Sequence, residues 1–241
     1  MLEALLLGAL AQSSLILTGL AVYLVKVPDR IVGAIAGYGV GALLGAVAFD
    51  LIPESDVLPT LETSLWLLVG AGVFIVADYL VETKLSPGSK GSAAGESDGG
   101  GPLGIVVGSV VDGVPESVIF GIGVATLQPL SIPFLAAVWV SNIPQALAPS
   151  ADLVRSGWKP IRMTTMWAGV VIACGVAAAL GFIAASVLPD ALGGRAAAFA
   201  AGGLVAMLTN SLVPFAYQRA GSLAGITTVI GFAVAVATSS G

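Results

Sequence analysis

Residues 103–127 read LGIVVGSVVDGVPESVIFGIGVATL, an apolar run interrupted in its middle by Asp112, Pro115 and Glu116. A helix of about 20 mostly apolar residues is long enough to cross a lipid bilayer. Carboxylates near the centre of a bilayer are costly, and they normally face a cavity or a partner. The stretch therefore predicts a transmembrane helix with a polar site at its middle.

The composition of the whole chain leads to the same class of protein. The chain has 241 residues, of which 57% are hydrophobic and 10% are charged, whereas a soluble domain carries about 25% charged residues. Nine basic against fourteen acidic residues leave no basic face for nucleic acid. One cysteine and no histidine exclude a disulfide framework and a multi-cysteine metal site. We expect an all-α polytopic membrane protein whose main partner is the lipid bilayer, and not an enzyme.

The gaps between charged residues predict eight transmembrane spans in a single domain. The Gly- and Ser-rich residues 84–101 are predicted to form a flexible loop between the third and fourth spans. The predicted spans are residues 4–25, 31–53, 63–83, 103–127, 132–154, 163–188, 196–218 and 221–240.

The basic residues predict the orientation of these spans. With eight alternating spans, only Arg195 falls on one side of the membrane. The basic residues on the other side are Lys26, Arg30, Lys84, Lys90, Arg155, Lys159, Arg162 and Arg219. Because loops rich in Lys and Arg stay in the cytoplasm, both termini are predicted to be extracytoplasmic and loop 84–101 cytoplasmic. We expect a multi-pass protein of the cell (inner) membrane.

A proline motif recurs in four spans, each time with a polar residue three positions before the proline. The four pairs are Asp50 with Pro53, Asp112 with Pro115, Ser141 with Pro144, and Ser211 with Pro214. Spans two and seven, and spans four and five, are placed symmetrically about residues 128–131 and cross the membrane in opposite directions. This pattern predicts an inverted-topology repeat, which is typical of transporters. Four unrelated prolines are a poorer explanation, because the flanking residues are shared as well.

The carboxylates of the fourth span are the first candidate site. Asp112 and Glu116 are four residues apart and share a helix face, with Ser109 one turn before them. No Lys or Arg lies within a central apolar run, so a bound cation or protons must neutralise these carboxylates. Alternatively, the two acids are protonated and form a polar seam between helices.

Further oxygen ligands are predicted around the two central prolines. Pro115 and Pro144 each leave the carbonyl four residues earlier without its helical hydrogen bond. Asn142 and Gln145 can present amide oxygens. Alternatively, these amides serve only to join helices. Such oxygen ligands suit Mg²⁺ or Mn²⁺ better than Zn²⁺. Cys174 is more typical of a small core residue than of a ligand. We expect no resident cofactor, with the metal ion as the substrate.

At these residues the chain resembles the ZIP (Zrt/Irt-like protein) metal transporter family. Residues 112–117 match in register the family's helix-four string, His-Asn-x-Pro-Glu-Gly, and residues 141–146 match its helix-five string, His-(Asn/Glu/Asp)-Ile-Pro-Glu-Gly. Residues 49–54 and 199–214 resemble the family's helices two and seven. The resemblance covers nearly the whole chain and implies eight helices with a ZIP-like inverted repeat.

Glu116 is retained from the family's ligand positions and Asn142 fits its variable polar position in helix five, whereas Gly113 replaces the helix-four Asn and the remaining positions are also changed. The family's two histidines are replaced by Asp112 and Ser141, its helix-five glutamate by Gln145, its helix-six glutamate by Cys174, and its helix-seven acid by Ser211. The predicted metal ligands are Asp112, Glu116, Asn142 and Gln145, with Ser109, Ser141, Cys174, Ser211 and Asp50 as additional candidates.

The resemblance implies a transporter that moves divalent cations of the Mn, Mg, Fe or Zn class through an oxygen-rich site between helices four and five. It also implies movement of helices 1, 4, 5 and 6 against helices 2, 3, 7 and 8, and a homodimer. Two alternatives stay open. One is a ZIP-fold membrane protein that has lost metal transport and has a binding or regulatory role. The other is a carrier of another solute that uses Asp112 and Glu116 as proton acceptors.

Overall fold

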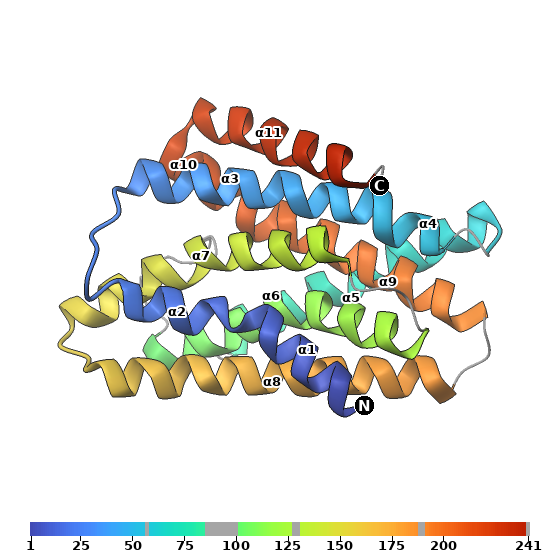
Figure 1. Cartoon of the computed structure of the whole chain (residues 1–241), viewed down its shortest axis with the longest axis horizontal. Coiled ribbons are helices and arrows are strands. Elements are labelled where there is room, and N and C mark those ends of the chain that lie inside the picture. The colour runs from blue at the N-terminus through green and yellow to red at the C-terminus, as the bar shows by residue number, and fades with distance from the viewer. Residues whose placement is uncertain (56–57, 85–100, 127–130, 188–190, 240–241) are drawn as a thin grey trace.

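The computed structural model describes residues 1–55, 58–84, 101–126, 131–187 and 191–239, and this part of the chain is helical without any strand. The helices join into eight rods that lie side by side along the long axis of the molecule (Figure 1). The elements are α1 (Leu2–Gln12), α2 (Ser14–Ala21), α3 (Asp29–Ala46), η1 (Val47–Leu51), α4 (Ile52–Glu54), α5 (Thr60–Lys84), α6 (Gly101–Ala125), α7 (Ile132–Arg155), α8 (Pro160–Val187), α9 (Ala191–Met207), η2 (Leu208–Leu212), α10 (Val213–Ala220) and α11 (Ser222–Ser239).

Six helices of the described residues are long and apolar enough to cross a membrane. They are Leu2–Ala21, Asp29–Leu51, Thr60–Leu80, Ile105–Ala125, Pro160–Val187 and Gly194–Ala220, and Ser222–Thr238 is a shorter apolar helix. Helix α7 is also long, but it carries the polar side chains of Ser141, Asn142 and Gln145, all of which are buried. The prediction of an all-helical chain with several apolar helices is confirmed.

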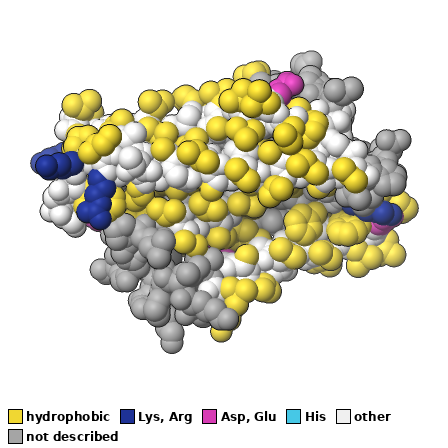
Figure 2. Space-filling model, turned by 90° about the horizontal axis from the view of Figure 1, so that it is seen from below, with side chains coloured by type: hydrophobic (Ala, Val, Ile, Leu, Met, Phe, Trp, Pro, Cys, Tyr) yellow, Lys and Arg dark blue, Asp and Glu magenta, His cyan; other side chains and the backbone are white. Residues whose placement is uncertain are grey.

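The outer surface of the bundle is apolar. Large hydrophobic side chains such as Leu2, Leu68, Leu180 and Val229 are exposed on four different helices. Figure 2 shows hydrophobic side chains spread along the visible face and charged side chains gathered toward its ends. A surface of this kind is expected where lipid surrounds the protein, because it would be unfavourable in water.

The predicted spans and the observed helices agree in position, and their ends differ by up to five residues. Most of the predicted loop 84–101 lies outside the described residues. The first predicted span, 4–25, is not one uninterrupted helix, because it breaks at Ser13 between α1 and α2. The Ser13 hydroxyl and backbone N–H donate to the Leu10 carbonyl at 2.6 and 3.1 Å, and the indole nitrogen of Trp139 donates to the same oxygen at 2.9 Å. These donors hold the Leu10 carbonyl in a turn at the middle of the first rod.

Two prolines follow π-helical turns at matching positions. Element η1 ends two residues before Pro53, and η2 ends two residues before Pro214. In each turn a backbone N–H donates to the carbonyl five residues earlier: Ile52 to Val47, and Val213 to Leu208. A proline cannot donate to the carbonyl four residues back and its ring clashes with it, so a wider turn relieves both constraints. Pro115 and Pro144 instead lie inside continuous α-helices.

Glycines let several helix backbones come into direct contact. A Cβ atom at Gly41 of α3 would collide with the backbone carbonyl of Thr228 on α11, and one at Gly121 of α6 would collide with the carbonyl of Ala178 on α8. Small residues allow this approach in membrane bundles, where close packing stabilises helix pairs. The α6–α8 contact holds the helix that carries Asp112 and Glu116.

Candidate functional site

The carboxylates of Asp112 and Glu116 both point into the interior of the bundle. Their side chains are 5% and 1% exposed, respectively, on the same face of α6. The two residues stand on either side of Pro115 in a helix that remains α-helical throughout. The structure therefore contains two buried acids one turn apart near the middle of an apolar helix.

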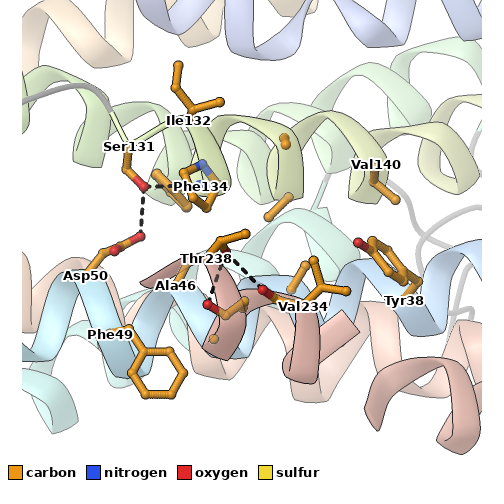
Figure 3. A pocket seen from close by; sticks show the side chains of 16 residues that line it. Tyr38, Ala46, Phe49, Asp50, Ser131, Ile132, Phe134, Val140, Val234 and Thr238 are labelled. Carbon is orange, nitrogen blue, oxygen red and sulfur yellow. Dashed lines mark hydrogen bonds between the residues drawn. The ribbon is translucent and has the colours of Figure 1, made fainter. Parts of the chain in front are cut away.

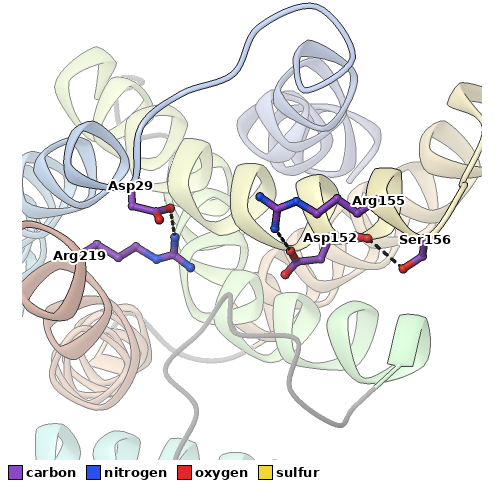
Figure 4. A network of polar contacts seen from close by, with 5 residues as sticks. All are labelled: Asp29, Asp152, Arg155, Ser156 and Arg219. Atoms are coloured by element: carbon purple, nitrogen blue, oxygen red, sulfur yellow. Dashed lines mark hydrogen bonds and ion pairs between the residues drawn. The ribbon is translucent and has the colours of Figure 1, made fainter.

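The ion pairs of the described residues lie away from these carboxylates. They join Arg155 to Asp152, Arg195 to Glu62, and Arg219 to Asp29, at 2.6–2.7 Å (Figure 4 shows the first and the last). Each pair includes at least one side chain that is about one-third exposed or more. Within the described part of the chain, no Lys or Arg pairs with Asp112 or Glu116.

Two amide side chains form a hydrogen-bonded chain that ends on Glu116. The Nδ2 atom of Asn142 on α7 donates to Oε1 of Gln12 on α1 at 2.9 Å, and Nε2 of Gln12 donates to Oε2 of Glu116 at 2.9 Å. All three side chains are about 1% exposed. We call Gln12, Asp112, Glu116 and Asn142 the carboxylate site; its residues come from three different helices.

One oxygen of Glu116 has no hydrogen-bond partner in the part of the chain that the structure describes. Its Oε1 atom is buried and makes no hydrogen bond with any described residue, and the same is true of the neighbouring Ser117 Oγ. A buried charged oxygen without a partner is strongly unfavourable, because it loses its hydration and gains nothing in return. Glu116 Oε1 is thus the atom at which this site can bind a cation or a proton.

Further polar groups approach the carboxylates from other helices. The Ser211 hydroxyl in η2 lies beside the Asp112 carboxylate, and Asp78 on α5 is near enough to Asp112 for their charges to interact. Asp78 is half-buried. The acids Asp78, Asp112 and Glu116 thus become progressively more buried toward the middle of the bundle.

Two smaller side chains lie next to Glu116. The hydroxyl of Ser141 on α7 is close to it and donates to the Val138 carbonyl at 2.9 Å. Cys174 of α8 is fully buried near the same carboxylate, and its Sγ would be 2.7 Å from a Cβ placed at Gly113. A glycine at position 113 therefore leaves the room that Cys174 occupies.

The structure brings most predicted site residues together, with exceptions. Asp112, Glu116, Asn142, Ser141, Cys174 and Ser211 surround one region, and Gln145 is buried one turn beyond Asn142 on α7. Asp50 instead accepts a 3.0 Å hydrogen bond from Ser131 at the edge of a separate cavity of about 380 Å³ lined by α3, α7 and α11 (Figure 3). Ser109 is partly exposed on α6.

The donor set limits what the site can bind. Among the described residues, no group of three His, Cys, Asp or Glu side chains is arranged to hold a metal ion. Carboxylate, hydroxyl and amide oxygens are the remaining donors, and such oxygens suit hard cations. The site is thus suited to a cation that is bound by few charged ligands and several neutral oxygens.

Two residues of this region were missed by the sequence analysis. Gln12 is followed by Ser13 and Ser14 in an otherwise apolar run, and such a polar interruption within a span is the signal that could have found it. Asp78 is a carboxylate inside the third apolar run. In both cases the sequence shows an unusual polar residue but not which helix it faces.

Comparison with known proteins adds no assignment, because the chain matches no protein-family model and no curated protein. The function must therefore be argued from the carboxylate site itself. Its defining features are two buried acids, one carboxylate oxygen without a partner among the described residues, and two amides in series that end on the other oxygen of Glu116.

Proposed function

We propose that this protein is a membrane transporter that moves divalent cations through the carboxylate site between α6 and α7, as ZIP proteins do. The observation that carries the proposal is Glu116, a buried carboxylate whose Oε1 atom has no partner among the described residues. It lies one helical turn from Asp112, which is also buried. A divalent cation at this oxygen would supply the missing partner.

The charge balance supports a cation of this kind. Two carboxylates taken out of water are costly unless an opposite charge compensates them. In the described part of the chain neither acid has a basic partner, since every ion pair there involves other residues. One divalent cation would neutralise both charges at once.

The ligand chemistry supports hard cations before soft ones. Carboxylate and amide oxygens favour Mg²⁺ and Mn²⁺, whereas Zn²⁺ is usually held by His and Cys. The chain has no histidine and a single cysteine. We therefore rank Mn²⁺ and Mg²⁺ ahead of Fe²⁺ and Zn²⁺ as substrates.

The arrangement of the helices supports a transporter architecture. In this proposal the eight rods are eight transmembrane spans, both termini are extracytoplasmic, and two copies form a dimer. The matching π-turns before Pro53 and Pro214, and the matching prolines inside α6 and α7, support an inverted repeat. The half-buried Asp78 near the end of α5 would attract cations toward Asp112.

Transport by purified protein in liposomes tests the proposal. Uptake of Mg²⁺, Mn²⁺, Fe²⁺, Co²⁺, Ni²⁺, Zn²⁺ and Cd²⁺ is compared for wild type, Glu116→Gln and Glu62→Gln. Glu62→Gln is the matched control, because it removes the same charge from a peripheral ion pair. We expect uptake of at least one hard cation, lost in Glu116→Gln and retained in the control. Equal uptake by wild type and Glu116→Gln would contradict the proposal.

A second function is favoured by one observation, the lack of any described cluster of three acidic, His or Cys ligands. Two buried carboxylates alone are also what a proton-coupled carrier of another solute requires. Uptake that depends on pH, without any thermal stabilisation by metal ions, would identify this function. Thermal stabilisation by a metal without uptake would identify a binding or regulatory protein instead.

A further inference from the structure

The break in the first rod is held in place by α7. Trp139 donates its indole N–H to the Leu10 carbonyl at 2.9 Å, and Asn142 approaches the Ala11 carbonyl at 3.4 Å. Trp139 and Asn142 are three residues apart and lie on one face of α7. Helix α1 ends at the next residue, Gln12, whose side chain is directed at Glu116.

The direction of the hydrogen bonds around Gln12 follows from Glu116. An ionised carboxylate only accepts hydrogen bonds, so the Gln12 amide must present Nε2 to it. The Gln12 Oε1 atom then faces Asn142, which must donate through Nδ2. Asn142 therefore donates to Gln12, and Gln12 donates to Glu116. This orientation of the two amides is expected when the carboxylate holds no cation.

We infer that Gln12 is a cation ligand contributed by α1, and that it binds after its amide group has turned over. This rotation of the Gln12 amide group places Oε1 beside Glu116 and Nε2 toward Asn142. The Asn142 amide turns as well, so that its oxygen accepts from Nε2, and only the long 3.4 Å contact to Ala11 is given up. This inference rests on the proposed function and adds a neutral oxygen to the same site.

The position of Gln12 favours this rotation. Its Nε2 atom donates to Oε2, the second oxygen of the carboxylate that would bind the cation through Oε1. A cation that engages both oxygens of Glu116 would be repelled by the amide hydrogens and attracted by the amide oxygen. Rotation about the last side-chain bond needs no backbone movement and preserves the bond between Gln12 and Asn142. Gln12 would then act with Glu116 and Asp112, so that three side chains from two helices hold one ion.

The variants Gln12→Met and Gln12→Glu together separate this role from a merely structural one. A side chain that only donates to Oε2 loses its donor in both variants, whereas an oxygen ligand is lost only in Gln12→Met. If Gln12 is a ligand, methionine removes an oxygen from the ion and binding weakens. If Gln12 only caps Glu116 in the empty site, methionine removes a competitor for the carboxylate, and binding is unchanged or tighter. Gln12→Glu provides an oxygen in either orientation and a further charge, so it should bind more tightly.

The experiment measures Mn²⁺ binding to the purified full-length protein from the loss of the free-ion EPR signal. We expect Gln12→Met to raise Kd about tenfold, the loss of about 1.4 kcal/mol, and Gln12→Glu to lower it. Ser14→Ala is the control, since Ser14 is buried near the same break and its hydroxyl has no partner among the described residues. The control should bind as wild type does.

Each outcome has a definite meaning. Binding by Gln12→Met that equals or exceeds that of wild type overturns the role of Gln12 and leaves the proposed function standing. A Kd of Gln12→Glu equal to or above that of wild type also overturns the inference, and this variant decides alone if Gln12→Met does not fold, as judged by thermal unfolding. If wild type binds none of the cations in the uptake screen, the proposed function fails and the inference fails with it.

Discussion

The indole nitrogen of Trp167 on α8 donates a 2.9 Å hydrogen bond to the hydroxyl of Ser150 on α7, and neither side chain is exposed. A Cβ at Gly19 of α2 would be 2.5 Å from the same indole ring. This one contact region therefore joins the second half of the first rod to α7 and α8. These rods also carry Gln12, Asn142 and Cys174 around the carboxylate site.

A double-mutant cycle of Trp167→Phe and Ser150→Ala should reveal a favourable coupling. Hydrogen bonds between membrane helices contribute about 0.6 kcal/mol on average and up to about 1.7 kcal/mol. We expect a value toward the upper end, because both groups are fully buried. The measurement is the free energy of unfolding of the four proteins in mixed micelles. A coupling of zero would mean that the hydrogen bond does not stabilise the α7–α8 contact.

The variant Gly41→Ala should destabilise the bundle. The added Cβ would meet the Thr228 backbone, which cannot move without separating α3 from α11. Overpacking of this kind costs about 1–3 kcal/mol, seen as a lower thermal unfolding temperature. Gly225→Ala on α11 is the matched control, since a Cβ added there would have nothing within 4 Å among the described residues. Equal effects of the two substitutions would contradict the direct backbone contact.

Removal of the carboxylates should weaken cation binding in the order of their burial. Glu116→Gln and Asp112→Asn should each raise Kd about tenfold or more, since a contact with a charged group contributes about 1.5–3 kcal/mol. Asp78→Asn should raise it only about two- to fivefold, because a half-exposed charge contributes up to about 1 kcal/mol. Mn²⁺ titration of the purified protein measures all three. A stronger effect at Asp78 than at Glu116 would argue that the ion binds near α5.

Cysteine labelling tests the proposed orientation. The one natural cysteine, Cys174, is fully buried, so its reaction with labelling reagents should be slow. Cysteines introduced at Ser156 and at Ser92, the latter outside the described residues, should resist an impermeant thiol reagent added to intact cells. A cysteine at the exposed Thr60 should react quickly. The reverse pattern would mean that the basic loops are extracytoplasmic.

The positions of the helices could be predicted because most rods are apolar runs with charged residues at their ends, whereas α6 and α7 are separated by the uncharged residues 128–131. The break at Ser13 could not, since it depends on Trp139 and Asn142 reaching α1 from a helix about 130 residues away in sequence. The π-turns were also missed. Proline signalled an interruption in four helices, yet only Pro53 and Pro214 are preceded by a wider turn.

The candidate site could also be predicted only in part. Asp112 and Glu116 stand out in any apolar run, and their spacing predicts a shared face. The partner that contacts Glu116 could not be predicted, because the hydrophobic pattern of a membrane helix does not identify its neighbours. Gln12 was therefore left out, while Asp50, which carries the same proline motif as Asp112, was included although it lies beside Ser131 at another cavity.

The two π-turns have a consequence for how this chain compares with others of different length. A residue in an α-helix advances the helical phase by about 100°, and a π-turn contains one residue more than the α-helical turn it replaces. Deleting one residue within 47–51 or 208–212 would restore a continuous α-helix and keep the phase of everything beyond it. A one-residue gap at either place in an alignment would therefore mark a π-turn gained or lost inside a helix, where gaps are otherwise not expected.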